Sequence, residues 1–370
     1  MTRVHIVGPV YPYRAGIAYC TTRLAEELAK QFDVHVVSFS RQYPKRFYPG
    51  GSDVDETLRD RVPKNAEFAL DITSPASWLK TAWRLRRSKP DAVVFVWWIW
   101  VWALPYRLMI ALLPRRTNVI LQCHNVGDKE PARWKSWLTN QVLRRGDVLV
   151  VHAHGELLEA VRRSRGRRVV SAQLPVHELG GAMPSRQEAK RSLGLDGRDV
   201  ALFFGHVRPF KGLDIALRAW REIESDAVLL VAGEAWWESE AEYRRLAEGL
   251  ANVRLEFRFI PDAEIATYFA AADVVLAPYR TEAQSGVVLT AFHFGRPVIA
   301  AAVGGIPQIV ADGANGCLVR PEDPKALALA VDRFFGEADR GKLEEGAARS
   351  ASMHSWEDYG TLVARLVRQP

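Results

Sequence analysis

The hydrophobic positions in the first half of the chain form short apolar runs that alternate with segments of helical periodicity. In residues 21–31, for example, Leu24, Leu28 and Ala29 fall on one side of a helix. The runs between such segments are short and unbroken, as in strands that are buried on both faces of a parallel sheet. The predicted strands are residues 4–8, 34–39, 91–97, 118–123 and 147–151. This alternation predicts an α/β domain with a doubly wound, Rossmann-like sheet.

The same pattern starts again near residue 199. The second series of predicted strands covers residues 200–204, 227–232, 253–257, 274–277 and 297–300. Between the two series, residues 174–183 are rich in Pro and Gly, and Ser185 then precedes Glu188 at the spacing of a helix capping box. A chain of 370 residues also exceeds the size of one hydrophobic core. We therefore expect an N-terminal domain over residues 1–180 and a C-terminal domain over residues 185–350.

Residues 92–113 are apolar over a length that would cross a bilayer, and they contain Trp97, Trp98, Trp100 and Trp102. Pro105 and an arginine two residues later interrupt this segment. A buried strand followed by a Trp-rich, partly exposed helix fits the alternation of strands and helices on either side better than a membrane span does. Two interpretations of the tryptophans stay open: a surface that rests on a membrane interface, or an ordinary core strand and helix.

Composition and charge narrow the classes of partner. Hydrophobic residues make up 48% and charged residues 25% of the chain, as in globular proteins. The net charge of +7 favours anionic partners such as phosphates or acidic lipids. No RNA-binding motif, zinc knuckle or basic heptad region supports nucleic acid. The three cysteines lie far apart without metal-ligand spacing, so we expect no metal site and a reducing, cytoplasmic location.

Candidate chemistry gathers in the loops that follow two predicted strands of the second series. Arg208 and Lys211 follow the strand that ends at Gly205. Ligands of open α/β sheets bind at the carboxyl ends of the strands, where two cations would neutralise a diphosphate. Further along, Glu282 precedes Ser285-Gly286-Val287, which opens a helix whose free N–H groups suit a phosphate.

The loop after the first strand contains Ala15-Gly16-Ile17, where glycine allows a ligand to approach the backbone. It lacks the G-x-G-x-x-G spacing of dinucleotide-binding folds, so a nicotinamide enzyme is not supported.

With these motifs in order, the chain resembles the family 4 glycosyltransferases, which have the GT-B fold of two Rossmann-like domains that face a cleft. The resemblance covers nearly the whole chain. The matching motifs are Ala15-Gly16-Ile17; Gly205 with Arg208 and Lys211-Gly212; Val231-Ala232-Gly233-Glu234; Ala272-Asp273-Val274 before Pro278; Glu282 with Ser285-Gly286-Val287; Gly295-Arg296-Pro297-Val298-Ile299-Ala300; Gly304-Gly305-Ile306-Pro307; and Asp312-Gly313 with Asn315-Gly316. Ser355-Trp356-Glu357 resembles the start of the family's last helix, so residues 351–370 are expected to pack back on the N-terminal domain.

The resemblance implies a retaining transfer of a sugar from a nucleotide sugar, such as a GDP- or UDP-sugar, without a metal ion. It implies that Arg208 and Lys211 hold the diphosphate and that Glu282 contacts the donor sugar. It also implies that His124 lies near the reacting centre. The remaining donor-binding positions that it implies are Gly16, Gly205, Gly233, Glu234, Ile260, Ser285, Gly286, Val287 and Thr290.

Two positions depart from the family pattern. Thr290 replaces the second glutamate of the E-x7-E motif, which binds the ribose hydroxyls in the family. A lost charged hydrogen bond of this kind is worth roughly 1.5–3 kcal/mol. His206 stands where the family usually has an arginine, and Arg208 supplies a cation two residues later.

These observations lead to one principal function and two alternatives. We expect a glycosyltransferase whose acceptor is a lipid-linked or cell-surface glycan, acting in the cytoplasm at the inner face of an anionic membrane. The first alternative is a catalytically silent protein that binds a nucleotide sugar, and the second is a nucleotide-sugar epimerase of the same fold.

Overall fold

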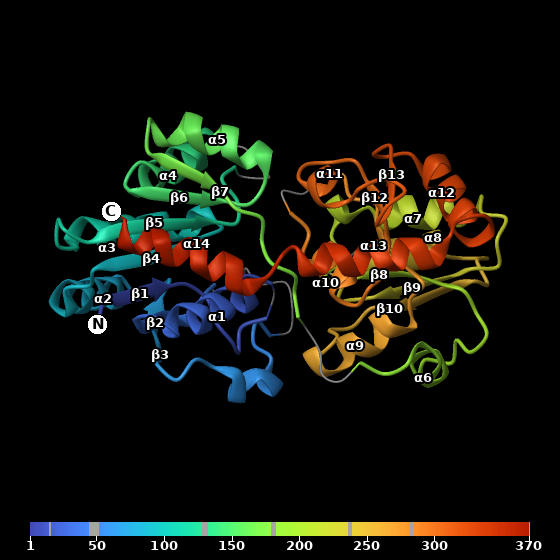
Figure 1. Cartoon of the computed structure of the whole chain (residues 1–370), viewed down its shortest axis with the longest axis horizontal. Helices are drawn as coiled ribbons and strands as arrows, with labels where there is room; N and C mark the ends of the chain where they lie inside the picture. Colours follow the sequence, from blue (N-terminus) through green and yellow to red (C-terminus); the bar gives the residue numbers. More distant parts are fainter. Residues whose placement is uncertain are drawn as a thin grey trace. The chain divides into compact units, whose positions relative to one another are not determined.

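The computed structural model describes residues 1–14, 16–43, 52–127, 132–178, 183–235, 239–281 and 284–369. The chain forms two compact units (Figure 1). Unit 1 contains residues 1–174 and 356–370, and unit 2 contains residues 175–355. Each unit has one sheet in which the strand pairs are parallel, so the expected α/β class with two doubly wound domains is confirmed.

The sheet of unit 1 has seven strands in the order β3-β2-β1-β4-β5-β6-β7. Its strands are β1 Arg3–Val7, β2 Asp33–Arg41, β3 Ala66–Asp71, β4 Ala92–Trp97, β5 Asn118–Cys123, β6 Val148–Val151 and β7 Arg168–Ser171. Every residue of the central strands β4 and β5 is buried, because helices cover both faces of the sheet. The strand order reverses between β1 and β4, which is the switch point of a doubly wound sheet.

The helices of unit 1 fall into two groups. α14, drawn in red, packs against α1 and β5 (Figure 1), whereas α2, α3, α4 and α5 form a consecutive row. Their bounds are α1 Gly16–Ala29, α2 Pro75–Ser88, α3 Ala103–Leu112, α4 Arg133–Leu143, α5 His154–Ser164 and α14 Trp356–Arg368, with short 3-10 turns at Glu56–Arg61 and Trp100–Trp102. Trp356 donates a hydrogen bond to the Tyr19 hydroxyl over 3.2 Å, and Gln122 donates one to the Tyr359 hydroxyl over 2.9 Å. The last helix therefore packs back on the N-terminal domain.

The Trp-rich segment forms a strand, a 3-10 turn and helix α3, as the strand–helix interpretation predicts. Trp97, Trp98 and Trp102 are at most 8% exposed, so these three belong to the core rather than to an exposed helix. The exposed tryptophans of unit 1 are Trp83 on α2 with Trp134 and Trp137 on α4. Within the described ranges, every helix is too short or too polar to cross a bilayer.

The sheet of unit 2 has six strands in the order β10-β9-β8-β11-β12-β13. The strands are β8 Val200–Phe204, β9 Val228–Ala232, β10 Val253–Glu256, β11 Val274–Ala277, β12 Val298–Ala301 and β13 Gly316–Val319. The helices are α6 Arg186–Ser192, α7 Leu213–Ala219, α8 Ser239–Leu246, α9 Asp262–Ala271, α10 Gly286–His293, α11 Ile306–Ile309, α12 Pro324–Gly336 and α13 Arg340–Ser352, with a 3-10 turn at Pro209–Lys211. The predicted capping box is confirmed, since Ser185 and Glu188 bond reciprocally at the start of α6.

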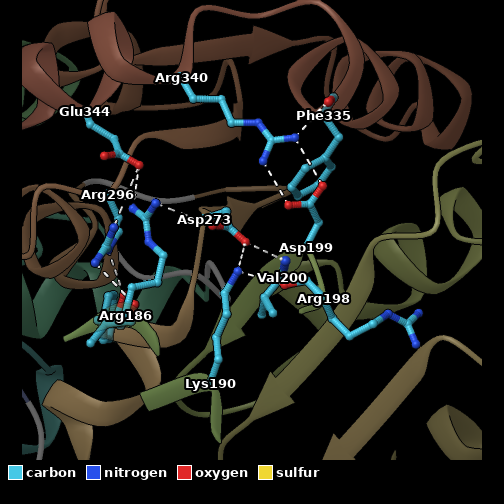
Figure 2. Close-up of polar contacts among 12 residues, drawn as sticks. Arg186, Lys190, Arg198, Asp199, Val200, Asp273, Arg296, Phe335, Arg340 and Glu344 are labelled. Atoms are coloured by element: carbon cyan, nitrogen blue, oxygen red, sulfur yellow. Dashed lines mark hydrogen bonds and ion pairs between the residues drawn. The ribbon is translucent and has the colours of Figure 1, made fainter. Parts of the chain in front are cut away.

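A polar network at the amino ends of β8 and β11 fixes these two neighbouring strands (Figure 2). The Asp273 carboxylate, only 4% exposed, accepts hydrogen bonds from the Val200 N–H over 2.8 Å and from Lys190 Nζ over 2.7 Å. Nearby, Arg340 pairs with Asp199 over 2.8 Å. Asp273 belongs to a motif that carries the family resemblance, yet it lies at the amino ends of the strands, where its role is structural.

Candidate functional site

The candidate site of unit 2 is built at the carboxyl ends of β8 and β11, where the strand order reverses. Gly205 follows β8 with a φ of 93°, which favours glycine. A Cβ on Gly233, just after β9, would lie 2.0 Å from the Gly205 carbonyl oxygen. The two backbones therefore approach each other so closely that only glycine fits at residue 233.

Lys211 is placed by the short turn after Gly205 and by its neighbour Gly212. A Cβ on Gly212 would lie 2.1 Å from the Pro278 carbonyl oxygen, so the turn packs directly on the loop after β11. This contact brings Lys211 Nζ to 3.3 Å from the Tyr279 hydroxyl and 4.8 Å from the centre of its ring. Tyr279 is buried, so its face and hydroxyl hold the ammonium group in one position.

Helix α10 begins at the same place. The Ser285 hydroxyl caps the helix by accepting the Val288 N–H over 3.3 Å, and it lies 3.5 Å from the Tyr279 hydroxyl. A Cβ on Gly205 would lie 3.5 Å from Val287 Cγ2 and 3.9 Å from Lys211 Nζ. A cation and a helix N-terminus thus converge beside a bare backbone turn, which is an arrangement that binds phosphate.

Arg208 precedes this turn and is half-buried, and its carbonyl oxygen accepts the Lys211 N–H over 2.8 Å. Arg280, which the sequence interpretation did not single out, holds the turn from the other side. Its guanidinium donates to the Pro209 carbonyl over 2.6 Å and to both Asp214 carboxylate oxygens over 2.9 and 2.7 Å. Burial raises the pKa of Asp214, but the hydrogen bonds and the charge of Arg280, together with the charge of Arg218, outweigh it and the net shift is downward. Both groups therefore stay charged.

Glu234 follows β9 directly after Gly233, and Ile260 lies between β10 and α9. His206 Nδ1 lies 3.9 Å from the Glu234 carboxylate, and the Glu234 carbonyl accepts the Val207 N–H over 2.9 Å. The His206 side chain thus faces the Glu234 carboxylate and does not stand in for the unpaired arginine that the family usually has at this position. Ile260 is 6% exposed and precedes α9.

Thr290 is 3% exposed and lies inside α10. Its hydroxyl donates to the Gly286 carbonyl over 2.8 Å, so its only side-chain proton is used within the helix. A ligand at this position therefore meets at most the acceptor lone pairs of the hydroxyl. Glu282, the expected contact with a donor sugar, lies outside the described residues.

His177 is a second residue that the sequence interpretation missed. It is 5% exposed, and burial lowers its pKa to about 4. A Cβ on Gly286 would lie 2.7 Å from His177 Cε1, so a neutral imidazole lies against the first turn of α10. The requirement for glycine at residue 286 therefore comes from this histidine.

In unit 1, two histidines lie close together at the carboxyl ends of β5 and β6. His124 follows β5, and its ring centre lies 5.2 Å from that of His152, which is 4% exposed. His152 Nδ1 lies 2.8 Å from the Ala172 carbonyl oxygen, and burial lowers the pKa of His152 to about 4. Tyr359 on α14 packs against the same ring. Gly16 is the first residue of α1.

The structure brings together in unit 2 five residues for which the sequence predicts phosphate contacts: Gly205, Lys211, Ser285, Gly286 and Val287. Tyr279 and Arg280 follow Pro278 directly, at the end of a predicted strand next to the site. Their place at a strand end was the one available signal in the sequence. His177 had none, because it lies in the Pro-rich segment between the two series of strands.

Comparison with known families gives matches to both units. The family described as Glycosyltransferase Family 4 matches residues 14–173. The family described as Glycosyl transferases group 1 matches residues 198–337. The two matched ranges follow each other along the chain and fall in the two separate units.

Curated relatives include the D-inositol 3-phosphate glycosyltransferase of Geodermatophilus obscurus, which is 32% identical over 273 residues, 69% of this chain and 59% of the relative. The enzyme of that name from Mycobacterium tuberculosis is 36% identical over 230 residues, 59% of this chain and 48% of the relative. The chain thus spans about half the length of the curated relatives that it matches.

Two solved structures share the fold over essentially the whole chain. Sucrose-phosphate synthase from Thermosynechococcus elongatus has a TM-score of 0.76 at 20% identity, covering 100% of this chain and 99% of that one. Anabaena HepE in complex with UDP and glucose has a TM-score of 0.78 at 15% identity, covering 100% of both chains. At such identities the likeness concerns the fold alone. Two matched family ranges, one in each doubly wound unit, show that the chain belongs to the family 4 glycosyltransferases of the GT-B fold.

Proposed function

We propose that this protein transfers a sugar from a nucleotide diphosphate sugar to an acceptor hydroxyl, with retention of the anomeric configuration and without a metal ion. The observation that carries the proposal is the convergence of Lys211 and the N-terminus of α10 beside Gly205. An ammonium group and free backbone N–H groups stabilise charge that develops on a departing diphosphate. Held by Tyr279, Lys211 is positioned before the reaction begins.

The donor proposed for this site is a UDP-sugar. Structures of Anabaena HepE, which shares the fold, contain UDP or UDP-glucose. In this chain Glu234 and Ile260 are the proposed contacts of the nucleoside, with Glu282 at the sugar. Thr290 offers no proton to the ribose, because its hydroxyl donates to the Gly286 carbonyl. We therefore expect weaker ribose binding than a glutamate at this position would give.

In the proposed reaction the bond between the donor's anomeric carbon and the diphosphate oxygen breaks. The acceptor oxygen attacks the same face of the sugar, and its proton passes to the departing phosphate oxygen. No side-chain nucleophile is needed. Lys211, Arg208 and the N-terminus of α10 stabilise the leaving charge, and Arg280 keeps the turn at residues 209–211 in place. His124 in unit 1 is the proposed contact near the reacting centre.

The proposed acceptor is a glycan carried by a lipid or assembled at the cell surface. Residues 75–168, which contain the helix row α2–α5, hold 18 Lys and Arg against 6 Asp and Glu. Exposed apolar side chains lie on the same row, among them Trp83, Trp134 and Trp137. Trp83 lies under the Arg87 guanidinium at 5.1 Å. Tryptophan beside cations suits the interface of an anionic membrane, and we propose that this row rests there.

The test is a transfer assay with UDP-glucose and other sugar nucleotides. D-inositol 3-phosphate, which appears in the names of the curated relatives, and lipid-linked glycans serve as acceptors. Proton NMR of the product reports the anomeric configuration. A retained anomer formed at the same rate in EDTA supports the proposal. An inverted anomer contradicts the retaining mechanism. Donor binding without transfer to any acceptor favours the silent alternative, and donor interconversion without an acceptor favours the epimerase.

Vesicle flotation tests the membrane contact. We expect the chain to float with vesicles that contain phosphatidylglycerol and not with neutral vesicles. Replacing Trp134 and Trp137 by serine is expected to reduce flotation, while the exposed Leu329→Ser change in unit 2 leaves it unaltered. Equal flotation of both variants would contradict an assignment to this helix row.

A further inference from the structure

Unit 1 contains a cavity of about 330 Å³ between the sheet and α2, away from the carboxyl ends of β1 and β4. β1 contributes Arg3 and His5, β2 contributes His35, and α2 contributes Arg84 and Ser88. Asn65, Glu67 and Thr81 also line it. Its volume lies at the lower end of the range of sites for small ligands, roughly 300–1,000 Å³. No step of the proposed transfer uses these side chains.

His5 is the buried polar group of this cavity. It is 8% exposed, and its Nε2 lies 3.1 Å from the Ser88 hydroxyl. Its other ring nitrogen, Nδ1, is buried and has no hydrogen-bond partner in the part of the chain that the structure describes. A buried nitrogen of this kind costs free energy unless something supplies its partner. His5 lines the cavity, so a molecule bound there lies beside this imidazole.

The charges around the cavity indicate what that molecule is. Arg3 and Arg84 bring two fixed positive charges, and the ring of His35 stacks on that of His5 with centres 5.2 Å apart. Two acids oppose them: Asp33 lies 3.2 Å from Arg3, and Glu67 pairs with Arg84. Side chains of both pairs are substantially exposed, so these pairs are weak and a ligand can compete for the guanidinium groups.

We propose that this cavity binds a small oxyanion, a phosphate or carboxylate group, which accepts hydrogen bonds from the Arg3 and Arg84 guanidinium groups and, when His5 is protonated, from its Nδ1–H. In the neutral form Nε2 carries the ring proton, because the Ser88 hydroxyl donates to the Leu85 carbonyl over 2.8 Å. An oxyanion has several acceptor lone pairs and matches the planar donors of arginine. A cation fits poorly, because both arginines line the space. This site is independent of the donor site in unit 2, and its existence does not rest on the proposed transfer.

Binding of an oxyanion is coupled to protonation of His5. Burial, together with the charges of His35 and Arg3, lowers the pKa of His5 to about 4, and Asp33 opposes this shift. From β3 and α2, Glu67 and Arg84 face the same space. A bound anion favours the imidazolium form and so raises the pKa of His5. By linkage, an anion whose own charge is constant over this range, such as acetate, binds more tightly as the pH falls from 8 toward 5.5.

The experiment titrates inorganic phosphate into the full-length chain and follows the imidazole signals of His5 by ¹H–¹⁵N NMR. Sodium chloride at matched ionic strength is the control for screening, and acetate distinguishes a carboxylate from a phosphate ligand. We expect saturable shifts with phosphate or acetate and none with chloride, and acetate, whose charge does not change, is expected to bind more tightly at pH 6 than at pH 8. Shifts equal to those in chloride, or phosphate binding that leaves His5 unmoved, would overturn the proposal.

Three variants assign the effect to the cavity. Arg84→Gln is expected to weaken binding at least about fivefold, in line with the loss of a charged hydrogen bond. Glu67→Gln removes the competing acid and is expected to tighten binding. Arg116→Gln removes a charge from an exposed position outside the cavity and should change nothing. Equal weakening by Arg84→Gln and Arg116→Gln would show a diffuse charge effect and would refute the site.

Discussion

The imidazole of His177 lies against the backbone of Gly286, where a Cβ would come within 2.7 Å of Cε1 and 3.0 Å of Nδ1. Gly286 is the first residue of α10, the helix whose N-terminus forms part of the proposed diphosphate site. The segment before the first helix of unit 2 thus fixes the position of this N-terminus. The packing of His177 on Gly286 thus links the stability of unit 2 to the geometry of the proposed donor site.

Replacing Gly286 by alanine is therefore expected to disturb both properties. The added methyl group must displace a buried ring, which typically costs about 1–3 kcal/mol. We expect a lower melting temperature and UDP binding weakened by about tenfold or more, as measured by calorimetry. Gly155→Ala is the matched control, since that glycine also lies in the first turn of a helix and its Cβ would meet nothing within 4 Å. Unchanged UDP affinity in Gly286→Ala would refute the link.

Arg280 is a positioning residue for the turn that carries Lys211. Lysine at this position cannot bond the Pro209 carbonyl and both Asp214 oxygens at once. We expect Arg280→Lys to lower kcat by roughly tenfold or more with little change in KM, because misplacement of a catalytic group mainly affects the transition state. Arg244→Lys, in an exposed pair with Glu240, should have no effect. A change in KM alone would argue against positioning.

Asp273 lies at the amino ends of β8 and β11, whereas the candidate site lies at their carboxyl ends. Its replacement is therefore expected to lower stability without changing the affinity for the donor. Asp273→Ala leaves the buried Lys190 ammonium with only the Arg198 carbonyl and leaves the Val200 N–H unsatisfied. Removing one member of a buried pair costs roughly 3–5 kcal/mol. We expect a large fall in the melting temperature of unit 2, while the UDP affinity of the folded protein stays within about twofold. A weakening of UDP binding greater than that would place Asp273 in the functional site.

Stability is expected to fall in mild acid. His5, His152 and His177 have pKa values lowered to about 4, mainly by burial, against about 6.5 in the unfolded chain. The unfolded state binds more protons between these values, so this contribution is complete above pH 6.5 and is lost as the pH falls toward 4. Each histidine contributes at most roughly 3 kcal/mol.

Calorimetric melting from pH 7.5 to 5 checks this expectation. His177→Asn should reduce the pH dependence of unfolding of unit 2 by about one proton. The exposed His154→Asn change in unit 1 is the control. An identical pH dependence in His177→Asn and in the unaltered chain would contradict the role of the buried imidazole.

The central strands of both sheets could be predicted from the sequence because they are buried on both faces and read as unbroken apolar runs. The strands that the pattern missed are β3, β7 and β13, and each lies at the edge of a sheet. Edge strands are only partly buried: β7, for instance, has two exposed and two half-buried residues. Their sequences therefore carry little of the hydrophobic signal on which the prediction depended.

The glycines and cations of the proposed phosphate site were singled out by motif spacing, because such residues at strand ends have direct physical reasons to be there. Tyr279 and His177 act through packing that only the tertiary structure reveals. The same holds for Thr290, whose hydroxyl donates a hydrogen bond to the Gly286 carbonyl. Buried contacts of this kind leave no periodic or compositional signal in the chain.

The most direct test of the central claim is the transfer rate of Lys211→Ala with a UDP-sugar donor, alongside its melting temperature. Lys211 is half-buried, and its ammonium group contacts the ring and hydroxyl of Tyr279, so the fold should persist without it. We expect a rate lowered by at least roughly 100-fold, as for the loss of one preorganised charge-stabilising donor, with a melting temperature close to that of the unaltered chain. Undiminished transfer by folded Lys211→Ala would contradict it.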